Sequence, residues 1–222
     1  MGIHGGAAQH QVPPPAAGAP LSAALWLLAA YLLGATPTSY IAGRIGRGID
    51  LREHGSKNLG ATNVYRVLGV RYAIPVGLVD VAKGAAAVAL LGAWARGPAW
   101  LPVALGVAAV LGHMYSPYVR FRGGKGVATA GGMFLALAPL AVLIALPVWG
   151  VTLWLSGFVS LSSIVAVLTF PVWVRLTAPG APFAFWASGA LALMIVFAHR
   201  SNIKRLLAGT ENRFRTRKAV AS

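Results

Sequence analysis

Three short polar segments hold the residues of this chain whose types and spacing could do chemistry. The first segment, residues 51–66, places Ser56, Asn58 and Arg66 in a stretch rich in Gly, Asn and Thr. Small hydroxyl and amide groups beside backbone N–H groups and a cation are the components of an anion-binding nest. An ordinary glycine-rich turn with the positive charge of a cytoplasmic loop has the same composition, so this segment alone leaves both interpretations open.

The second segment is the turn Gly123-Gly124-Lys125-Gly126, which leads into an apolar stretch. Glycines let the backbone approach an anion, a helix N-terminus would face that anion, and lysine supplies charge. The spacing G-x-x-x-x-G-K-[ST] is absent, so the turn is not a nucleotide-binding P-loop. Taken alone, a flexible basic loop is the simpler interpretation.

The third segment, residues 199–211, follows the last long apolar stretch. His199, Asn202 and Arg205 step by three residues, so a helix would place them on one face. Snorkelling of a basic helix end accounts for the Lys and Arg residues here, but it requires neither His nor Asn. Three anion-friendly segments together predict one shared cationic pocket.

The composition indicates the environment of this pocket. Of 222 residues, 57% are hydrophobic and only 10% are charged, and the mean hydropathy is +0.70. Soluble domains carry about a quarter charged residues, so we predict an all-α integral membrane protein. The net charge of +15 then reflects cytoplasmic loops near anionic lipid, and we expect no nucleic-acid partner.

The scarcity of acidic residues and the absence of cysteine exclude several kinds of catalytic site. Asp50, Glu53, Asp80 and Glu211 are the only carboxylates, which leaves almost nothing for a paired-carboxylate site or a carboxylate-ligated metal. Without cysteine, disulfides, thiolate catalysis and thiolate-bound zinc are excluded. We therefore expect neither a metal nor a cofactor.

The distribution of Lys and Arg predicts the topology. Cationic clusters occupy residues 44–71, 120–125 and 200–218, and if all are cytoplasmic, the number of spans between successive clusters must be even. Segments 72–94 and 100–118 lie between the first two clusters. Pro139, Ser156-Gly157 and residues 178–182 divide 126–199 into four segments, of which 126–138 is too short to cross alone.

With residues 21–45 as the first span, we predict about seven transmembrane helices, with short or broken helices around a site at the cytoplasmic face. The N-terminus would lie outside and the C-terminus inside. Five spans are the alternative, if two short segments are re-entrant. One polytopic domain, residues 21–212, would lie between a disordered N-terminal tail, 1–20, and a basic C-terminal tail, 213–222.

Two charged residues fall inside a predicted span. Asp80 and Lys83 are three residues apart and would share one helix face. Charges at this depth are unfavourable and are usually paired or functional. We favour a structural ion pair over a direct role in catalysis.

The three segments GSKNLGATN, GHMYSPYVRFRGGKGVAT and HRSNIKRLLAGTE closely resemble the signature motifs of the bacterial acyl-phosphate:glycerol-3-phosphate acyltransferase family. The resemblance runs from about Leu32 to Phe214. It implies transfer of a fatty acyl group from acyl phosphate to the 1-hydroxyl of sn-glycerol 3-phosphate. The products would be 1-acyl-sn-glycerol 3-phosphate (lysophosphatidic acid) and phosphate, in an early step of phospholipid biosynthesis in the bacterial cytoplasmic (inner) membrane.

The resemblance also implies partners and site residues. Glycerol 3-phosphate, acyl phosphate and membrane lipids are the implied partners, and no oligomeric state follows from the sequence. The implied catalytic residues are Ser56, Arg66, Lys125, His199 and Asn202, and those implied at substrate phosphate are Asn58, Gly123, Gly124, Lys125, Gly126 and Ser163.

The general base has two candidates. One is His199 and the other is a substrate phosphate, and we favour the phosphate, with His199 orienting the substrate. The sequence departs from the family pattern at Lys57, where Gly is more common, and at Ala198, where Arg is common.

Three rival functions make different demands on the sequence. Acyltransferases that use acyl-CoA or acyl-carrier protein show Asp five residues after His, and none of the five histidines here has it. An anion or lipid transporter would need a polar path to the outer face, for which only Arg96, Arg175 and the Asp80–Lys83 pair are available. A lipid-binding protein without catalysis is opposed only by the motif resemblance.

Overall fold

The computed structural model describes residues 20–214, and within that range every regular element is a helix. The predicted all-α class is therefore confirmed. The tails predicted at 1–20 and 213–222 lie almost wholly outside the described residues. In chain order the helices are α1 (Pro20–Ala35), α2 (Thr38–Arg47), α3 (Ala61–Leu68), α4 (Val70–Ala86), a π-helical turn (Ala87–Leu91), α5 (Gly92–Ala95), α6 (Leu101–Met114), a 3₁₀ turn (Pro117–Val119), α7 (Val127–Leu137), α8 (Pro139–Ser156), α9 (Val159–Thr177), α10 (Pro182–Ala198) and α11 (Arg200–Leu207).

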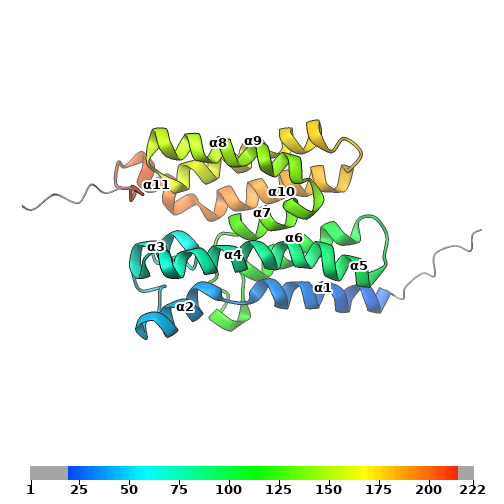
Figure 1. Cartoon of the computed structure of the whole chain (residues 1–222), viewed down its shortest axis with the longest axis horizontal. Coiled ribbons are helices and arrows are strands. Elements are labelled where there is room, and N and C mark those ends of the chain that lie inside the picture. The colour runs from blue at the N-terminus through cyan, green and yellow to red at the C-terminus, as the bar shows by residue number, and fades with distance from the viewer. Residues whose placement is uncertain (1–19, 215–222) are drawn as a thin grey trace, which may run out of the picture.

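The helices form two groups with α7 between them. In Figure 1, α8, α9 and α10 lie above α1, α4 and α6, and the short α7 lies at the junction of the two groups. Buried residues from both groups and from α7 form one apolar cluster, which includes Val110, Met133, Phe134 and Ile195. The cluster ties the upper group to the lower one through α7.

The predicted number of spans is not confirmed. By length and hydropathy, four helical stretches in the described residues could cross a membrane, namely Ser22–Arg47, Val70–Ala95, Pro139–Ser156 and Val159–Thr177. The pair α10 and α11, bent by 57°, would make a fifth, and α7 is apolar but short. The first described helix begins at one end of the molecule, and the last lies at the opposite end (Figure 1).

Two helix crossings are so close that only glycine fits. A Cβ atom on Gly34 would lie 2.0 Å from the carbonyl oxygen of Ala109, and one on Gly112 would lie 2.0 Å from that of Tyr31. These reciprocal contacts join α1 to α6. Gly84 and Gly132 make the equivalent contacts between α4 and α7. Small residues at crossings of apolar helices allow close backbone packing where water-driven burial is weak.

The α1–α6 crossing gives a stability prediction. A Gly112→Ala substitution would force a methyl group against backbone that cannot rotate away, so the helices must separate. We expect a loss of about 1–3 kcal/mol, typical of overpacking, measured by thermal unfolding in detergent. The matched control is Gly189→Ala in α10, where the added Cβ meets no atom within 4 Å. Equal unfolding temperatures for the two variants would contradict this packing account.

The first predicted span, residues 21–45, is broken at Thr36-Pro37 into α1 and α2. Proline has no N–H to donate and restricts the residue before it, so the helix ends here. The free carbonyls of the break are satisfied by side chains from elsewhere. The Ser116 hydroxyl donates to the Ala35 carbonyl at 2.6 Å, and the Lys83 ammonium donates to the Thr36 carbonyl at 3.1 Å.

The Asp80–Lys83 pair lies at this break. The Lys83 ammonium is 2.9 Å from Asp80, and both side chains are almost fully buried. The Thr38 hydroxyl, in the first turn of α2, donates to the same Asp80 oxygen at 2.6 Å. Because the pair holds both sides of the broken helix, the structure supports the structural role favoured from the sequence.

Candidate active site

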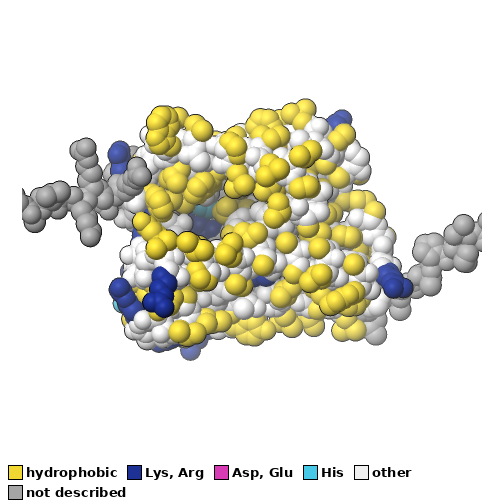
Figure 2. Space-filling view, viewed as in Figure 1, with side chains coloured by type: hydrophobic (Ala, Val, Ile, Leu, Met, Phe, Trp, Pro, Cys, Tyr) yellow, Lys and Arg dark blue, Asp and Glu magenta, His cyan; other side chains and the backbone are white. Residues whose placement is uncertain are grey.

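A cavity of about 510 Å³ lies between the two helix groups. Figure 2 shows it as a hollow in a side face that is otherwise largely hydrophobic, with cationic and histidine side chains visible at its base. One end of the cavity is polar and the rest is apolar. Of the residues predicted at the site, those that line the cavity are Ser56, Asn58, Arg66, Lys125, Gly126, Ser163, His199 and Asn202.

The first polar loop is held in place by Asn63, a residue that sequence reasoning did not single out. Its side chain is buried, its oxygen accepts the Ser56 N–H at 2.8 Å, and its amide donates to the carbonyls of Leu51 and His54 at 3.0 and 3.1 Å. Asn63 therefore folds the loop so that Ser56 faces the cavity. The available signal in the sequence is an Asn seven residues after Ser56, close enough along the chain for its side chain to bond the backbone of the loop.

Arg66 projects from the short helix α3 into the same polar end. Burial lowers the pKa of Arg66, but a guanidinium remains protonated at neutral pH. Its side chain also donates to the carbonyl of Asn212 at 3.3 Å, and Phe214 stacks on Tyr65. The segment after α11 thus crosses to α3 and closes one side of the polar end.

Lys125 and the start of α7 form the centre of the polar end. Gly126 has a φ of +85° and immediately precedes α7, whose first residues, Val127 and Ala128, line the cavity. The first N–H groups of a helix have no partner within it and favour an anion. Burial lowers the pKa of Lys125 to about 8, and its ammonium donates to the side-chain oxygen of Asn202.

Gly123 and Gly124 do not line the large cavity. Their N–H groups donate to the carbonyls of Met114 and His113, each at 3.1 Å. A Cβ atom on Gly124 would lie 2.2 Å from Nε2 of His113, so only glycine lets the turn rest on the end of α6. Direct binding of phosphate by these two residues stays a prediction, since in this structure their amides hold the turn.

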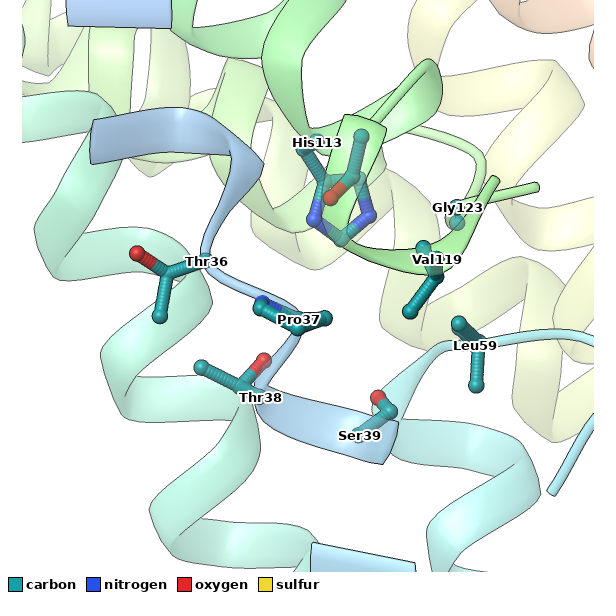
Figure 3. A pocket seen from close by; sticks show the side chains of 10 residues that line it. Thr36, Pro37, Thr38, Ser39, Leu59, His113, Val119 and Gly123 are labelled. Carbon is teal, nitrogen blue, oxygen red and sulfur yellow. The ribbon is translucent and has the colours of Figure 1, made fainter. Parts of the chain in front are cut away.

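A small second cavity lies behind the turn. Figure 3 shows the His113 ring between Gly123 and Val119 on one side and Thr36 to Ser39, from the α1–α2 break, on the other. The hydroxyl of Ser39 is buried here without a hydrogen-bond partner among the described residues. The volume, about 10 Å³, is close to the least that a single water needs.

His199 lies at the bend between α10 and α11 and is almost fully buried. Its Nδ1 donates to the Ile195 carbonyl at 2.8 Å, which leaves Nε2 free to accept a hydrogen bond in the cavity. Burial, together with the nearby charge of Lys125, lowers the pKa of His199 to about 4. The ring is therefore neutral at pH 7.

Glu211 organises the polar end and was missed from the sequence as a site residue. Its carboxylate accepts from Asn202 at 2.6 Å, from the Ser160 hydroxyl at 2.8 Å and from Nε of Arg205 at 2.6 Å. Burial opposes its ionisation, but these hydrogen bonds outweigh burial and lower the pKa of Glu211. The carboxylate orients the Asn202 amide, whose oxygen in turn receives Lys125.

Ser163 lies one helical turn deeper than Ser160 on α9. Its hydroxyl donates to the Val159 carbonyl at 2.9 Å and accepts from the Trp149 indole at 3.3 Å. It lies where the polar end meets the apolar wall.

Among the described residues, no group of His, Cys, Asp or Glu gathers in a way that could hold a metal ion.

Comparison with known proteins identifies the family. Residues 24–209 match the family model described as glycerol-3-phosphate acyltransferase. A relative named glycerol-3-phosphate acyltransferase from Synechococcus sp. (strain JA-2-3B'a(2-13)) is 47% identical over 193 residues, covering 87% of this chain and 95% of the relative. One of the same name from Chlorobaculum tepidum is 37% identical over 218 residues, covering 84% and 94%.

Two crystal structures of PlsY, an integral membrane glycerol 3-phosphate acyltransferase, share the fold. The glycerol 3-phosphate form superposes with a TM-score of 0.81 at 37% identity, covering 90% of this chain and all of that one. The lysophosphatidic acid form gives 0.76 at 37% identity, covering 86% and 95%. The chain belongs to the glycerol-3-phosphate acyltransferase family and is a multi-pass integral membrane protein.

Proposed function

We propose that this protein transfers a fatty acyl group from acyl phosphate to the 1-hydroxyl of sn-glycerol 3-phosphate, releasing lysophosphatidic acid and phosphate. The observation that carries the proposal is the cavity itself, which joins a cationic polar end to a long apolar wall. Both substrates bear phosphate, and the acyl donor also bears a hydrocarbon chain. A single cavity of this character accommodates both at once.

The polar end supplies the groups that bound phosphate requires. Lys125 and Arg66 provide charge, the start of α7 provides backbone N–H groups, and Ser56 provides a small donor. We assign Asn58 and Gly126 to the same phosphate-binding surface, and Ser163 to its inner edge. Preorganised donors of this kind stabilise the charge that develops as the phosphate leaves.

The reaction at this site is a direct acyl transfer. The 1-hydroxyl oxygen of glycerol 3-phosphate bonds to the acyl carbonyl carbon, and the bond from that carbon to the phosphate oxygen breaks. The hydroxyl proton passes to a base, and inorganic phosphate departs as a stable anion that needs little acid assistance. His199 and Asn202 would hold the glycerol part, with Asn202 fixed by Glu211.

We infer that a substrate phosphate, rather than His199, takes the proton. Burial and the charge of Lys125 lower the pKa of His199 to about 4, so its ring is a weak base in the free enzyme. With the orienting ring removed, His199→Ala should still react in single turnover, slowed by about a hundredfold through misplacement. Complete loss of chemistry with glycerol 3-phosphate binding intact would instead assign the base to His199.

The reaction is tested with the purified protein, palmitoyl phosphate and glycerol 3-phosphate, by following phosphate and lysophosphatidic acid together. We expect equal amounts of the two products, dependence on glycerol 3-phosphate, and no turnover of palmitoyl-CoA. Binding of both substrates in lipid without turnover would contradict the proposal and favour a transporter or a lipid-binding protein.

The pH dependence of the reaction should report Lys125. In the free enzyme the pKa of Lys125 is about 8, so its charge is present below that pH and is lost above it. We therefore expect kcat/KM for glycerol 3-phosphate to fall as pH rises through about 8. In Lys125→Arg the guanidinium stays charged, so any residual activity should not show this fall. If kcat/KM falls in the same pH range in the unaltered enzyme and in Lys125→Arg, then Lys125 does not cause the fall.

We propose further that the polar end faces the cytoplasm of a bacterial inner membrane, with the N-terminus outside. The basic helices α2, α3 and α11 gather at one end of the molecule, opposite the start of α1 and the end of α5 (Figure 1). Positive charge of this kind marks cytoplasmic surfaces. The natural chain has no cysteine, so single-cysteine variants provide an unambiguous test.

An impermeant maleimide should label Ala99→Cys on intact spheroplasts and should label Ser201→Cys only after permeabilisation. Both residues are exposed. Ala99 lies between α5 and α6, and Ser201 lies in α11, at opposite ends of the molecule (Figure 1). The opposite labelling pattern would invert the proposed topology.

A further inference from the structure

The apolar part of the cavity is a pocket with a defined direction. On α9, Ser163, Ala166, Val167 and Phe170 line it, so three- and four-residue steps present one face of the helix along its length. The antiparallel α10 lines it from His199 back to Ser188. The pocket therefore extends from the polar end along α9 and α10 towards the opposite side of the molecule.

Two aromatic rings in contact with each other line this pocket away from its polar end. Phe134 of α7 and Phe170 of α9 lie towards the far ends of the lining stretches of their helices, counted from the polar end, with ring centroids 4.8 Å apart at an angle of 59°. Phe134 is 3% exposed and belongs to the apolar cluster that joins the helix groups. A ring fixed in a packed cluster forms a wall, because protein interiors have little free volume into which it could move.

The depth of the pocket follows from helix geometry. Seven residues separate Ser163 from Phe170, and eleven separate Ser188 from His199, which correspond to about 10 Å and about 16 Å at 1.5 Å per residue. The hollow in Figure 2 lies towards the end of the molecule that holds α3 and α11. In this view the opening of the cavity is therefore nearest the polar end.

We propose that the Phe134–Phe170 pair is the end wall of the acyl-chain pocket and determines the length of acyl chain that the enzyme prefers. This inference rests on the acyl transfer proposed above. A chain that reaches the rings fills the pocket, and a longer one must displace a packed ring or bend back. A shorter chain leaves empty space at the rings. Ala166, midway along the wall, marks where added bulk would shorten the pocket.

The test is a competition among acyl donors. The purified enzyme is given an equimolar mixture of lauroyl, myristoyl, palmitoyl and stearoyl phosphate with glycerol 3-phosphate, and the lysophosphatidic acid species are counted by mass spectrometry. In Phe170→Ala the ratio of stearoyl to lauroyl product should rise about tenfold, and in Ala166→Leu it should fall about tenfold, since one methylene in an apolar pocket changes discrimination by that order. Phe170→Leu, a milder change, should shift the ratio in the same direction as Phe170→Ala if the latter does not fold.

The matched control is Phe183→Ala, because Phe183 is 48% exposed and lies outside the cavity. It should leave the product ratio unchanged. Unchanged ratios in Ala166→Leu and in the folded Phe170 variants, with total product still formed, would overturn the proposed end wall alone. Absence of any lysophosphatidic acid from the unaltered enzyme would overturn the proposed function, so the two failures are distinguishable.

Discussion

Replacing Lys125 by alanine is expected to lower kcat/KM for glycerol 3-phosphate by about a thousandfold, the upper range for loss of one preorganised charge-stabilising donor. Lys125 is a half-buried cation beside the start of α7, so its loss removes charge from a place that water screens less than it does the surface. Steady-state kinetics of phosphate release measure the effect. We expect kcat to fall as well as KM to rise, because the charge on the phosphate grows as it leaves.

The control for this variant is Lys204→Ala on α11. Lys204 is exposed and does not line the cavity, so its loss removes a positive charge from the same side of the molecule without touching the site. Its kinetics should stay within about twofold of the unaltered enzyme, as expected for a screened surface charge. Equal effects in the two variants would show that only the general electrostatic field matters and that Lys125 holds no substrate.

Replacing Asp80 by alanine is expected to reduce the free energy of unfolding by about 3–5 kcal/mol. The substitution leaves Lys83 as an unpaired buried cation and removes the acceptor of the Thr38 hydroxyl. The two halves of the first span would then lose the link that holds them across Thr36-Pro37. Thermal unfolding in detergent measures the change.

Two comparisons make the Asp80 result interpretable. Glu53→Ala removes an exposed carboxylate, so its unfolding temperature should barely change. Asp80→Leu combined with Lys83→Met removes both charges together and should recover much of the loss, since no unpaired buried charge remains. If Asp80→Ala unfolds like the natural protein, the ion pair does not support the break.

Much of the helix pattern could be predicted because glycine and proline mark the ends. Gly157, with a φ of +75°, follows the last residue of α8, and Pro182 begins α10, close to where the sequence divided the apolar stretch. The segment 126–138 was predicted to be too short to cross alone, and α7 covers Val127–Leu137. Apolar length and these two residue types are local properties, so a single sequence carries them.

The break in the first span was missed although Pro37 signals it. Proline is tolerated within apolar helices when other groups satisfy the freed carbonyls, so its presence does not decide between a bend and a break. Here the satisfying groups are Ser116 and Lys83, about 80 and 47 residues from their partners. Contacts at that separation depend on tertiary structure, which the sequence pattern does not display.

The predicted site residues lie around one cavity, whereas several contacts among the residues there were not predicted. Ser56, Arg66, Lys125, His199 and Asn202 all line one cavity, as their motifs suggested. The part played by Glu211 was not anticipated, because a lone carboxylate among cations gives no indication of which amide it orients. The N–H groups of Gly123 and Gly124 donate hydrogen bonds to carbonyls at the end of α6. The glycine content of the turn does not indicate these contacts.

The structure also gives a reason for the glycine that the family pattern has at position 57. Lys57 adopts a φ of +59°, a left-handed conformation that glycine reaches without strain and other residues reach at a penalty of about 1–2 kcal/mol. Gly is more common at this position in the family that the motifs resemble. The surrounding loop, held by Asn63, maintains the lysine in this conformation.

The charges at the polar end act on the product as well as on the substrates. Lys125, Arg66 and Arg205 outnumber the carboxylate beside them, Glu211, and the Asp80 carboxylate is paired with Lys83. An oxyanion from the buffer, or the phosphate just released, is therefore drawn to the same place as glycerol 3-phosphate. We therefore expect inorganic phosphate to compete with this substrate, so that added phosphate raises KM for glycerol 3-phosphate in steady-state kinetics and leaves kcat unchanged.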